Sequence, residues 1–129
     1  MKQTGHFKGW LLAATLLLVL AAFVQRDDIV AALRAGNAER LARHFDQAVD
    51  ITLPDKSNTF SKGQAELVLR DFFAQHRVRN FAVQHSGSNP NSHFIIGTLS
   101  TSDGDFRTTV FIRQRGDKQL IQGIEIQVR

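Results

Sequence analysis

The chain contains no cysteine, no tyrosine and only two prolines among its 129 residues. Without cysteine it forms no disulfide, no thiolate metal site and no lipid attachment through sulfur. Packing alone must therefore hold its core together. Because cysteine and tyrosine normally titrate in the alkaline range, their absence, together with the arginine content, accounts for the high sequence isoelectric point of about 10.1.

The sequence also lacks a concentrated excess of one charge. Its formal net charge is +4, but Lys2 and Lys8 lie in an N-terminal segment of their own, and the remaining chain carries 14 basic against 12 acidic residues. Nucleic-acid-binding domains usually need a concentrated basic stripe. No nucleic-acid partner is therefore expected.

The most informative feature that is present is an apolar run from Trp10 to Val24, interrupted only by Thr15. At about 1.5 Å per residue this run gives about 22 Å of helix, which is shorter than the roughly 30 Å hydrocarbon core of a bilayer. We therefore expect residues 1–24 to be a secretory signal peptide. Residues 25–129 then form a single exported domain, either periplasmic or secreted.

The cleavage site is ambiguous, because small residues are expected one and three positions before the cut. A cut after Ala21 has Val19 at the third position, and a cut after Ala22 has Leu20 there. An uncleaved helix that tethers the domain to the inner membrane is the alternative, and the positive-inside rule gives it the same orientation. A membrane is a partner only if residues 1–24 are retained.

Local patterns predict three helices and five strands in the remaining chain. The helices are expected over residues 27–35, 38–45 and 62–76, the last of them opened by a capping box from Ser61 to Gln64. The strands are expected over residues 49–53, 80–85, 93–100, 106–114 and 119–128, the last three as an antiparallel meander. Asp55 to Asn58 and Ser86 to Ser92 are predicted to be mobile connections.

Alternation in the meander predicts a sheet with one apolar and one polar face. Along residues 106–114 the apolar face carries Phe106, Val110 and Ile112, and the other face carries Arg107, Thr109 and Arg113. Helices must cover the apolar face, so the predicted fold class is α+β, with helices packed on one face of a curved antiparallel sheet. The interior is expected to hold Phe45, Phe72, Phe73 and Ile96.

This order of elements is similar to the cone of the nuclear transport factor 2-like superfamily, a cystatin-like α+β fold. Closer resemblance comes from Ile29-Val-Ala-Ala-Leu-Arg-Ala-Gly-Asn37, Phe60-Ser-Lys-Gly-Gln-Ala65 and Ile96-Gly-Thr-Leu99. These segments resemble a bacterial family of exported single-domain proteins classified as domain of unknown function 4783. The resemblance implies a fold and an exported location, but it carries over no activity, cofactor or site residue.

Two candidates for a catalytic base come from the helix 62–76 and the first strand. His76 continues the apolar stripe of the helix, and histidine titrates near neutral pH. The last turn of a helix also favours histidine electrostatically, so His76 is better explained as an edge residue of the core. Asp50 alternates with Val49 and Ile51, so it is buried only if its strand is inverted.

His85 is the third candidate. It is predicted to share a face with Phe81 and Val83, and pairing with the next strand would bring it near His93. No HxH or HxxxH spacing accompanies these histidines. We therefore expect no metal and no other cofactor.

Candidate binding residues lie on the exposed face of the sheet. Arg107 and Arg113 offer planar donors to a carboxylate or phosphate, although cross-strand pairing with Glu125 explains them as well. Phe111 is an apolar residue on the same face, which indicates a homodimer through the sheet.

The leading hypothesis is an exported, non-enzymatic binding or interaction module, and a small apolar ligand is another possible partner. The alternatives are a small lyase, isomerase or hydrolase acting in the cone, and a membrane-tethered assembly factor.

Overall fold

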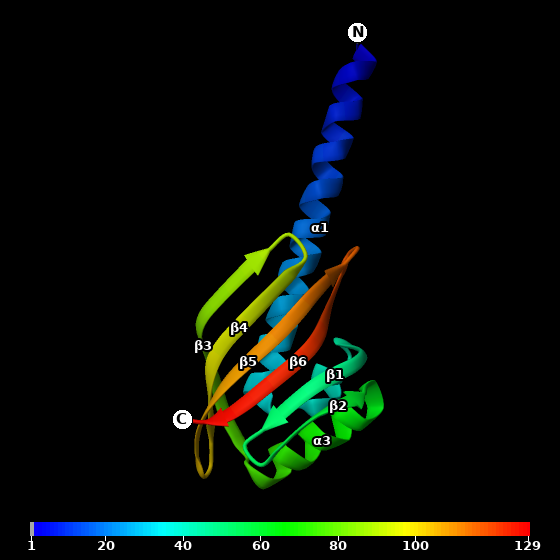
Figure 1. The fold of residues 1–129 in the computed structure, drawn as a ribbon. Helices are drawn as coiled ribbons and strands as arrows, with labels where there is room; N and C mark the ends of the chain where they lie inside the picture. Colours follow the sequence, from blue (N-terminus) through cyan, green and yellow to red (C-terminus); the bar gives the residue numbers. More distant parts are fainter. Residues whose placement is uncertain (1) are drawn as a thin grey trace.

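The computed structural model describes residues 2–129, without the side chains of residues 2–11, 18 and 21–23. Its elements are α1 (Lys2–Ala35), α2 (Ala38–Ala42), β1 (Phe45–Leu53), β2 (Lys56–Ser61), α3 (Lys62–Gln75), β3 (Val78–Asn89), β4 (Ser92–Thr101), β5 (Gly104–Arg115) and β6 (Lys118–Val128). Helices pack on one face of a curved sheet, as Figure 1 shows. The predicted α+β fold class is confirmed.

The sheet has six strands in the order β2-β1-β6-β5-β4-β3. All neighbours are antiparallel except β1 and β6, which pair in parallel. The predicted meander is correct and also includes β3. The parallel pair joins the beginning of the domain to its end, since β2, α3 and strands β3 to β5 lie between β1 and β6 in the chain.

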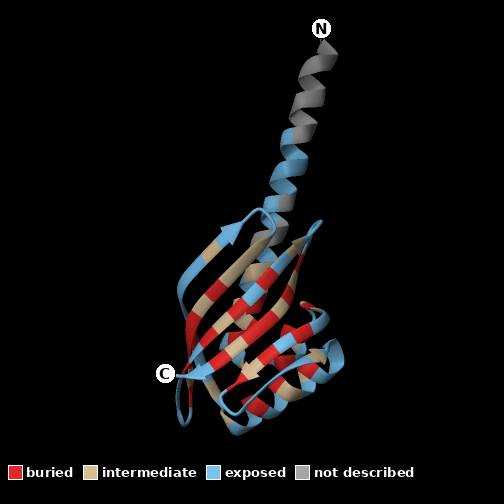
Figure 2. Cartoon of the chain, viewed as in Figure 1, coloured by how far each residue is buried: buried red, intermediate tan, exposed pale blue. Residues whose placement is uncertain are grey.

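Helices α1 and α3 cover different parts of the concave face of the sheet. The second half of α1 contacts β3 and β6, while α3 contacts β1 and β2 and packs against α2. Buried residues alternate with exposed or half-buried ones along β5, as Figure 2 shows. The enclosed core is formed chiefly by aliphatic and phenylalanine side chains, including Ile29, Leu33, Leu41, Phe45, Leu69, Phe72, Phe73, Phe81, Ile95, Leu99, Val110 and Ile124.

The helices begin and end for the predicted local reasons, with two corrections. Gly36 ends α1 at a φ of 61°, and the Asn37 side chain caps α2 by accepting a hydrogen bond from the Arg40 backbone. However, α1 does not begin near residue 27, because the apolar run continues it from Lys2 without a break. The second helix is also shorter than predicted, because the chain enters β1 at Phe45.

The capping box of α3 is present, with Ser61 and Gln64 each accepting a hydrogen bond from the backbone of the other. The two segments predicted as connections are instead largely strand. Residues 56–61 form β2, which pairs with β1 from Leu53↔Lys56 to Ala48↔Ser61. Residues 86–89 extend β3 into a hairpin with β4, so only Pro90 and Asn91 turn. Polar, weakly patterned residues formed these strands because a neighbouring strand was available to pair with them.

An irregularity in β3 changes which residues face the core. The pairing shifts between Val83↔Gly97 and His85↔Ile96, so an extra residue lies in β3 at this point. His85 therefore lies on the opposite face from Phe81, and the predicted shared face is wrong. The predicted approach of His85 to His93 is also wrong, because His93 pairs with Ser88.

Candidate functional site

The narrow part of the cone is packed by side chains. Phe45, Phe72 and Phe73 are all buried there, as predicted, and the rings of Phe72 and Phe106 meet edge to face at 5.4 Å. Ile96 does not contribute, because it pairs with Thr109 on the outer face of the sheet. Alternation with the buried Ile95 excludes it from the interior.

A recess remains at the wide end of the cone, between α1 and strands β3 to β5. Its volume is about 300 Å³, and its walls include Ile95 and Ile112 from the sheet and Val19 from α1. The polar side chains that line it include Arg26 and His93. The recess therefore combines apolar side chains from both the helix and the sheet with polar groups from the sheet and one positive charge from α1.

Two consecutive side chains of α1 tie the helix to the rim of this recess. Gln25 donates to the carbonyl oxygen of Asp117 at 2.7 Å and accepts from the backbone N–H of Gln119 at 2.6 Å. Arg26 donates through Nη2 to the Ser86 hydroxyl at 3.0 Å. These bonds hold α1 against the β5–β6 turn on one side and against β3 on the other.

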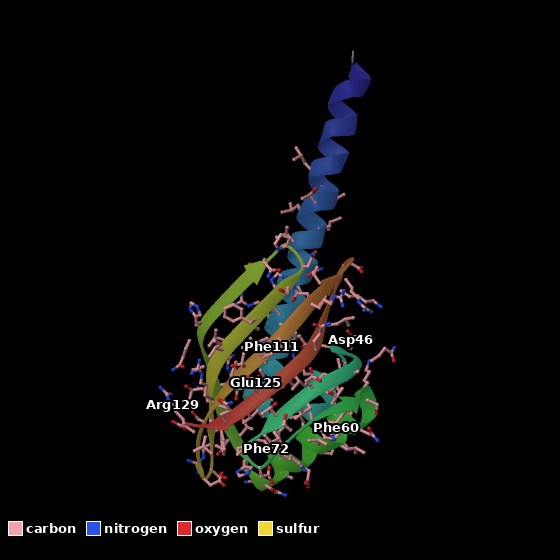
Figure 3. All side chains as sticks on the ribbon, in the orientation of Figure 1. Asp46, Phe60, Phe72, Phe111, Glu125 and Arg129 are labelled. Atoms are coloured by element: carbon pink, nitrogen blue, oxygen red, sulfur yellow. The ribbon has the colours of Figure 1, made fainter. Side chains whose placement is uncertain are left out.

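The outer face of the sheet has an apolar centre, which we call the outer patch and define as Phe94, Ile96 and Phe111. Phe94 and Phe111 are directly opposite each other on β4 and β5, and Phe111 is 42% exposed. The Phe94 ring lies over Gly87, where a Cβ would collide with it. Figure 3 shows Phe111 on the side of the sheet turned away from α1.

Charged residues surround the outer patch unevenly. Arg107 and Arg113 project from β5 on the same face as Phe111, whereas Glu125 lies on β6 and Asp50 on β1. Figure 3 shows Glu125 beside Phe111 on this face. Basic groups thus lie toward the β3–β5 half of the sheet, and acidic groups lie toward the β6–β1 half.

A groove of about 580 Å³ crosses the basic half of this face. Arg107, His85 and Thr98 line it, and Arg129 donates to the Thr98 hydroxyl at 2.6 Å at its edge. The structure therefore brings a predicted base candidate and a predicted binding residue, His85 and Arg107, to one groove. Arg113 does not line it.

His76 lies at the narrow end of the cone, as the C-cap of α3. Its Nδ1 is 2.8 Å from the Asp103 carboxylate, and its ring packs at 4.5 Å from Phe72 and 5.2 Å from Phe106. The pKa of Asp103 is lowered, first by the hydrogen bond from the Thr101 hydroxyl and then by His76, against an opposing effect of burial. Sequence reasoning missed Asp103, since no local pattern links a helix end to a turn 27 residues later.

Asp50 is exposed on the outer side of β1, and its carboxylate accepts a hydrogen bond from Thr59 at 2.5 Å. The strand is not inverted. His76, Asp50 and His85 thus occupy the end of α3, the outer side of β1 and the outer side of β3. The structure does not bring the three base candidates together.

A half-buried polar cluster joins the two N-terminal helices. The Asp28 carboxylate is 2.6 Å from His44 Nε2 and accepts from Arg40 Nε at 2.7 Å. The hydrogen bond with His44 is the largest cause that lowers the pKa of Asp28, and Arg40 lowers it further, while burial opposes both. Since all its members are satisfied within the cluster, this arrangement stabilises the α1–α2 corner.

Within the part of the chain whose side chains are described, no group of three or more histidines and carboxylates is placed to hold a metal ion. The same residues include no helical stretch long and apolar enough to cross a membrane.

The sequence profile of one family, described as domain of unknown function (DUF4783), matches residues 26–127. The chain belongs to this family. The match begins at Arg26, the residue of α1 that first bonds to β3. No functionally curated protein matches the chain.

Solved structures of the family have the same fold. A DUF4783 protein from Bacteroides fragilis YCH46 is 35% identical, with a TM-score of 0.76 over 79% of this chain and 96% of its own. One from Bacteroides uniformis ATCC 8492 is 33% identical, with a TM-score of 0.77 over 80% and 95%. An NTF2-like protein of unknown function from Cytophaga hutchinsonii ATCC 33406 is 10% identical, with a TM-score of 0.57 over 87% of each chain. The predicted family and superfamily fold are confirmed.

Proposed function

We propose that this DUF4783 chain is an exported, non-enzymatic interaction module that self-associates through the outer face of its sheet. The observation that carries the proposal is the outer patch, because an exposed Phe111 beside a half-buried Phe94 at the centre of a solvated face would be unfavourable in a monomer. A surrounding ring of charged and polar groups is typical of a protein interface.

The distribution of charge on this face favours a second copy as the partner. Phe111 and Gly123 are directly opposite on the two central strands, β5 and β6. A two-fold axis parallel to these strands would place the basic β3–β5 half of one copy over the acidic β6–β1 half of the other. Arg107 and Arg113 would then approach carboxylates such as Glu125 and Asp50 of the partner, which gives the pairing electrostatic complementarity.

The shape of the face supports the same partner. Gly123 leaves room beside Phe111, whose ring would be 3.5 Å from a Cβ at that position. Sheets that pack face to face lie about 10 Å apart, and a stable interface buries about 800 Å² from each partner. A six-stranded face offers an area of this order.

A catalytic role is left out of the proposal because of where the three base candidates lie. None of His76, Asp50 and His85 lines the recess on the concave side, and each lies on a different element. The narrow part of the cone, where the ring of His76 packs against Phe72 and Phe106, is filled with phenylalanine and aliphatic side chains.

The export part of the proposal concerns the first half of α1. This half extends beyond the sheet, as Figure 1 shows, and Leu12, Leu16 and Leu17 are exposed on it. In the second half, Gln25 and Arg26 hydrogen-bond to the β5–β6 turn and to β3. This division supports a leader or tether ahead of the domain.

The intact mass of the protein after expression tests this part of the proposal. A new N-terminus at Ala22 or Phe23 indicates a signal peptide, and a full-length product in the membrane fraction indicates a tether.

Self-association is tested by sedimentation of Phe111→Glu beside Leu67→Glu in the full-length chain. Leu67 is 60% exposed on α3, away from the outer face, so it is a matched control for adding a charge to an exposed apolar site. We expect the wild type and Leu67→Glu to form dimers and Phe111→Glu to be shifted toward monomers. Both variants keep the N-terminal helix, so association through that helix is common to both. A monomeric wild type at high concentration, or equal behaviour of the two variants, would overturn the proposal.

A further inference from the structure

The recess at the wide end of the cone lies between α1 and the sheet, and of the outer patch it shares only Phe94. It has a volume of about 300 Å³ and is lined by Arg26, Ser86, Ser88 and His93 in addition to its apolar residues. This volume is at the lower end of the range for small-molecule sites. Its lining combines an apolar wall with a small group of converging polar side chains, which is typical of such sites.

Arg26 gives the recess its positive charge. Arg40, Arg70 and Arg115 each lie within ion-pair distance of a carboxylate. Among the described side chains, Arg26 has no carboxylate partner, and its one hydrogen bond goes to the neutral Ser86 hydroxyl. That bond uses one Nη atom and leaves other donors of the guanidinium available.

The lining of the recess adds no negative charge beside Arg26. No acidic side chain is among the described residues that line the recess. Asp27 follows Arg26 in the chain but is exposed outside this lining, and Asp28 is already bonded to Arg40 and His44. A half-buried cation beside an apolar wall is therefore uncompensated, and a bound anion would satisfy it.

We propose that this recess binds a small monocarboxylate with a short apolar body. The single guanidinium matches one negative charge, and its planar donors suit the two oxygens of a carboxylate. Ser86 orients the guanidinium, while Ser88 and His93 supply further polar groups at the rim. The apolar body contacts Ile95 and Ile112, which form the floor.

The composition of the recess also discriminates against other ligand classes. A phosphate ester carries close to two negative charges and usually requires several basic donors, whereas this recess has one arginine. A neutral apolar molecule would leave the charge of Arg26 unsatisfied. Val19 belongs to the predicted leader, so leader cleavage would widen the recess but leave Arg26 and the sheet residues in place.

The test uses phenylacetate and its neutral counterpart phenylacetamide, which share shape but differ in charge. Binding to the full-length chain is measured by calorimetry and by the NMR signals of the His93 ring. We expect saturable binding of phenylacetate and at least about tenfold weaker binding of phenylacetamide, since hydrogen bonds to charged groups contribute that much. The signals of His93 should shift during the phenylacetate titration.

Four variants locate the site. Arg26→Gln should weaken phenylacetate binding about tenfold or more, Arg26→Lys should weaken it less because the charge remains, and Ser86→Ala should weaken it about threefold. Arg34→Gln is the matched control, because Arg34 lies on the same helix and donates to the Phe81 carbonyl oxygen instead. Thermal melting of each variant reports whether the fold is intact.

Three outcomes would overturn the inference. These are equal binding of phenylacetate and phenylacetamide to the wild type, equal weakening by Arg26→Gln and Arg34→Gln, and the absence of saturable phenylacetate binding at millimolar concentration. Dimer formation is measured independently, so failure of this site leaves the proposed self-association unaffected.

Discussion

The two faces of the sheet are built from the same strands but differ in what their side chains contact. On the concave face, Ile95, Leu99, Val110 and Ile124 are enclosed by α1 and α3. On the outer face, Phe111 is exposed among arginine, threonine and glutamate. Since burial of apolar area drives folding, the concave face supplies the stability and the outer face is left to interact with a partner. Substitutions on the two faces should therefore have separable effects.

The largest expected loss of stability is at Phe81. Its side chain is fully buried and its ring fills the space above Gly97. Phe81→Ala should lower the free energy of unfolding by about 3–5 kcal/mol, because it removes apolar contacts and leaves a cavity. Denaturant unfolding at a concentration where the chain is monomeric measures this loss. A change below about 1 kcal/mol would contradict the assignment of the core to this face.

Adding a side-chain atom at Gly97, against the Phe81 ring, should have the next largest effect on the free energy of unfolding. A Cβ at Gly97 would lie 2.5 Å from the Ala82 carbonyl oxygen and 2.6 Å from the Phe81 ring. Gly97→Ala should therefore destabilise the chain by about 1–3 kcal/mol. Gly63→Ala is the control, because nothing lies near its Cβ and it is in α3, where alanine is favoured by about 1 kcal/mol. Opposite signs for the two substitutions in thermal or chemical unfolding are expected.

The cluster of Asp28, Arg40 and His44 should make the free energy of unfolding depend on pH. The pKa of Asp28 is lowered in the folded state, so its contribution is present above the unfolded-state pKa of the carboxyl group and is lost as the pH falls through the folded-state value. Asp28→Asn should cost about 1 kcal/mol near neutral pH and reduce the steepness of acid unfolding. Unfolding measured from pH 7 downward checks this. An unchanged acid limb in Asp28→Asn would contradict it.

The smallest expected change in stability is on the outer face. Phe111→Ala should alter the free energy of unfolding of the monomer by less than about 0.5 kcal/mol, since the side chain is 42% exposed. Its dimerisation should nevertheless be weakened, because exposed aromatic residues often dominate interfaces. Unfolding at low concentration and sedimentation at high concentration, made on the same variant, separate the two effects. A large loss of monomer stability would show that Phe111 belongs to the core.

Much of the fold was predictable because local signals agreed with the tertiary structure. The Ser61–Gln64 capping box, the Gly36 stop and the period-two pattern of β5 each predicted an element that is present. β2 was missed because its residues are polar and it exists through pairing with β1. The continuous α1 was missed because we assigned the apolar run to a separate leader, although nothing in the sequence breaks the helix between Val24 and Ile29.

The candidate site was less predictable because it depends on distant residues. The outward placement of Arg107, Phe111 and Arg113 followed from alternation alone. His85 was misplaced because no residue type signals the extra residue in β3. The recess required Arg26 and Ser86 to meet across 60 positions of sequence, and no local pattern predicts such a contact.

The most direct test of the central claim, that the outer face is an interface between two copies, uses the absence of cysteine. Thr109→Cys introduces the chain's one thiol beside Phe111 on β5, and Asn91→Cys introduces one at the β3–β4 turn as a control. Sheets about 10 Å apart bring the two Thr109→Cys thiols within reach of a short bis-maleimide. We predict a covalent dimer from Thr109→Cys at low micromolar concentration and little or none from Asn91→Cys. Equal crosslinking of the two variants, or none in either, would contradict the account.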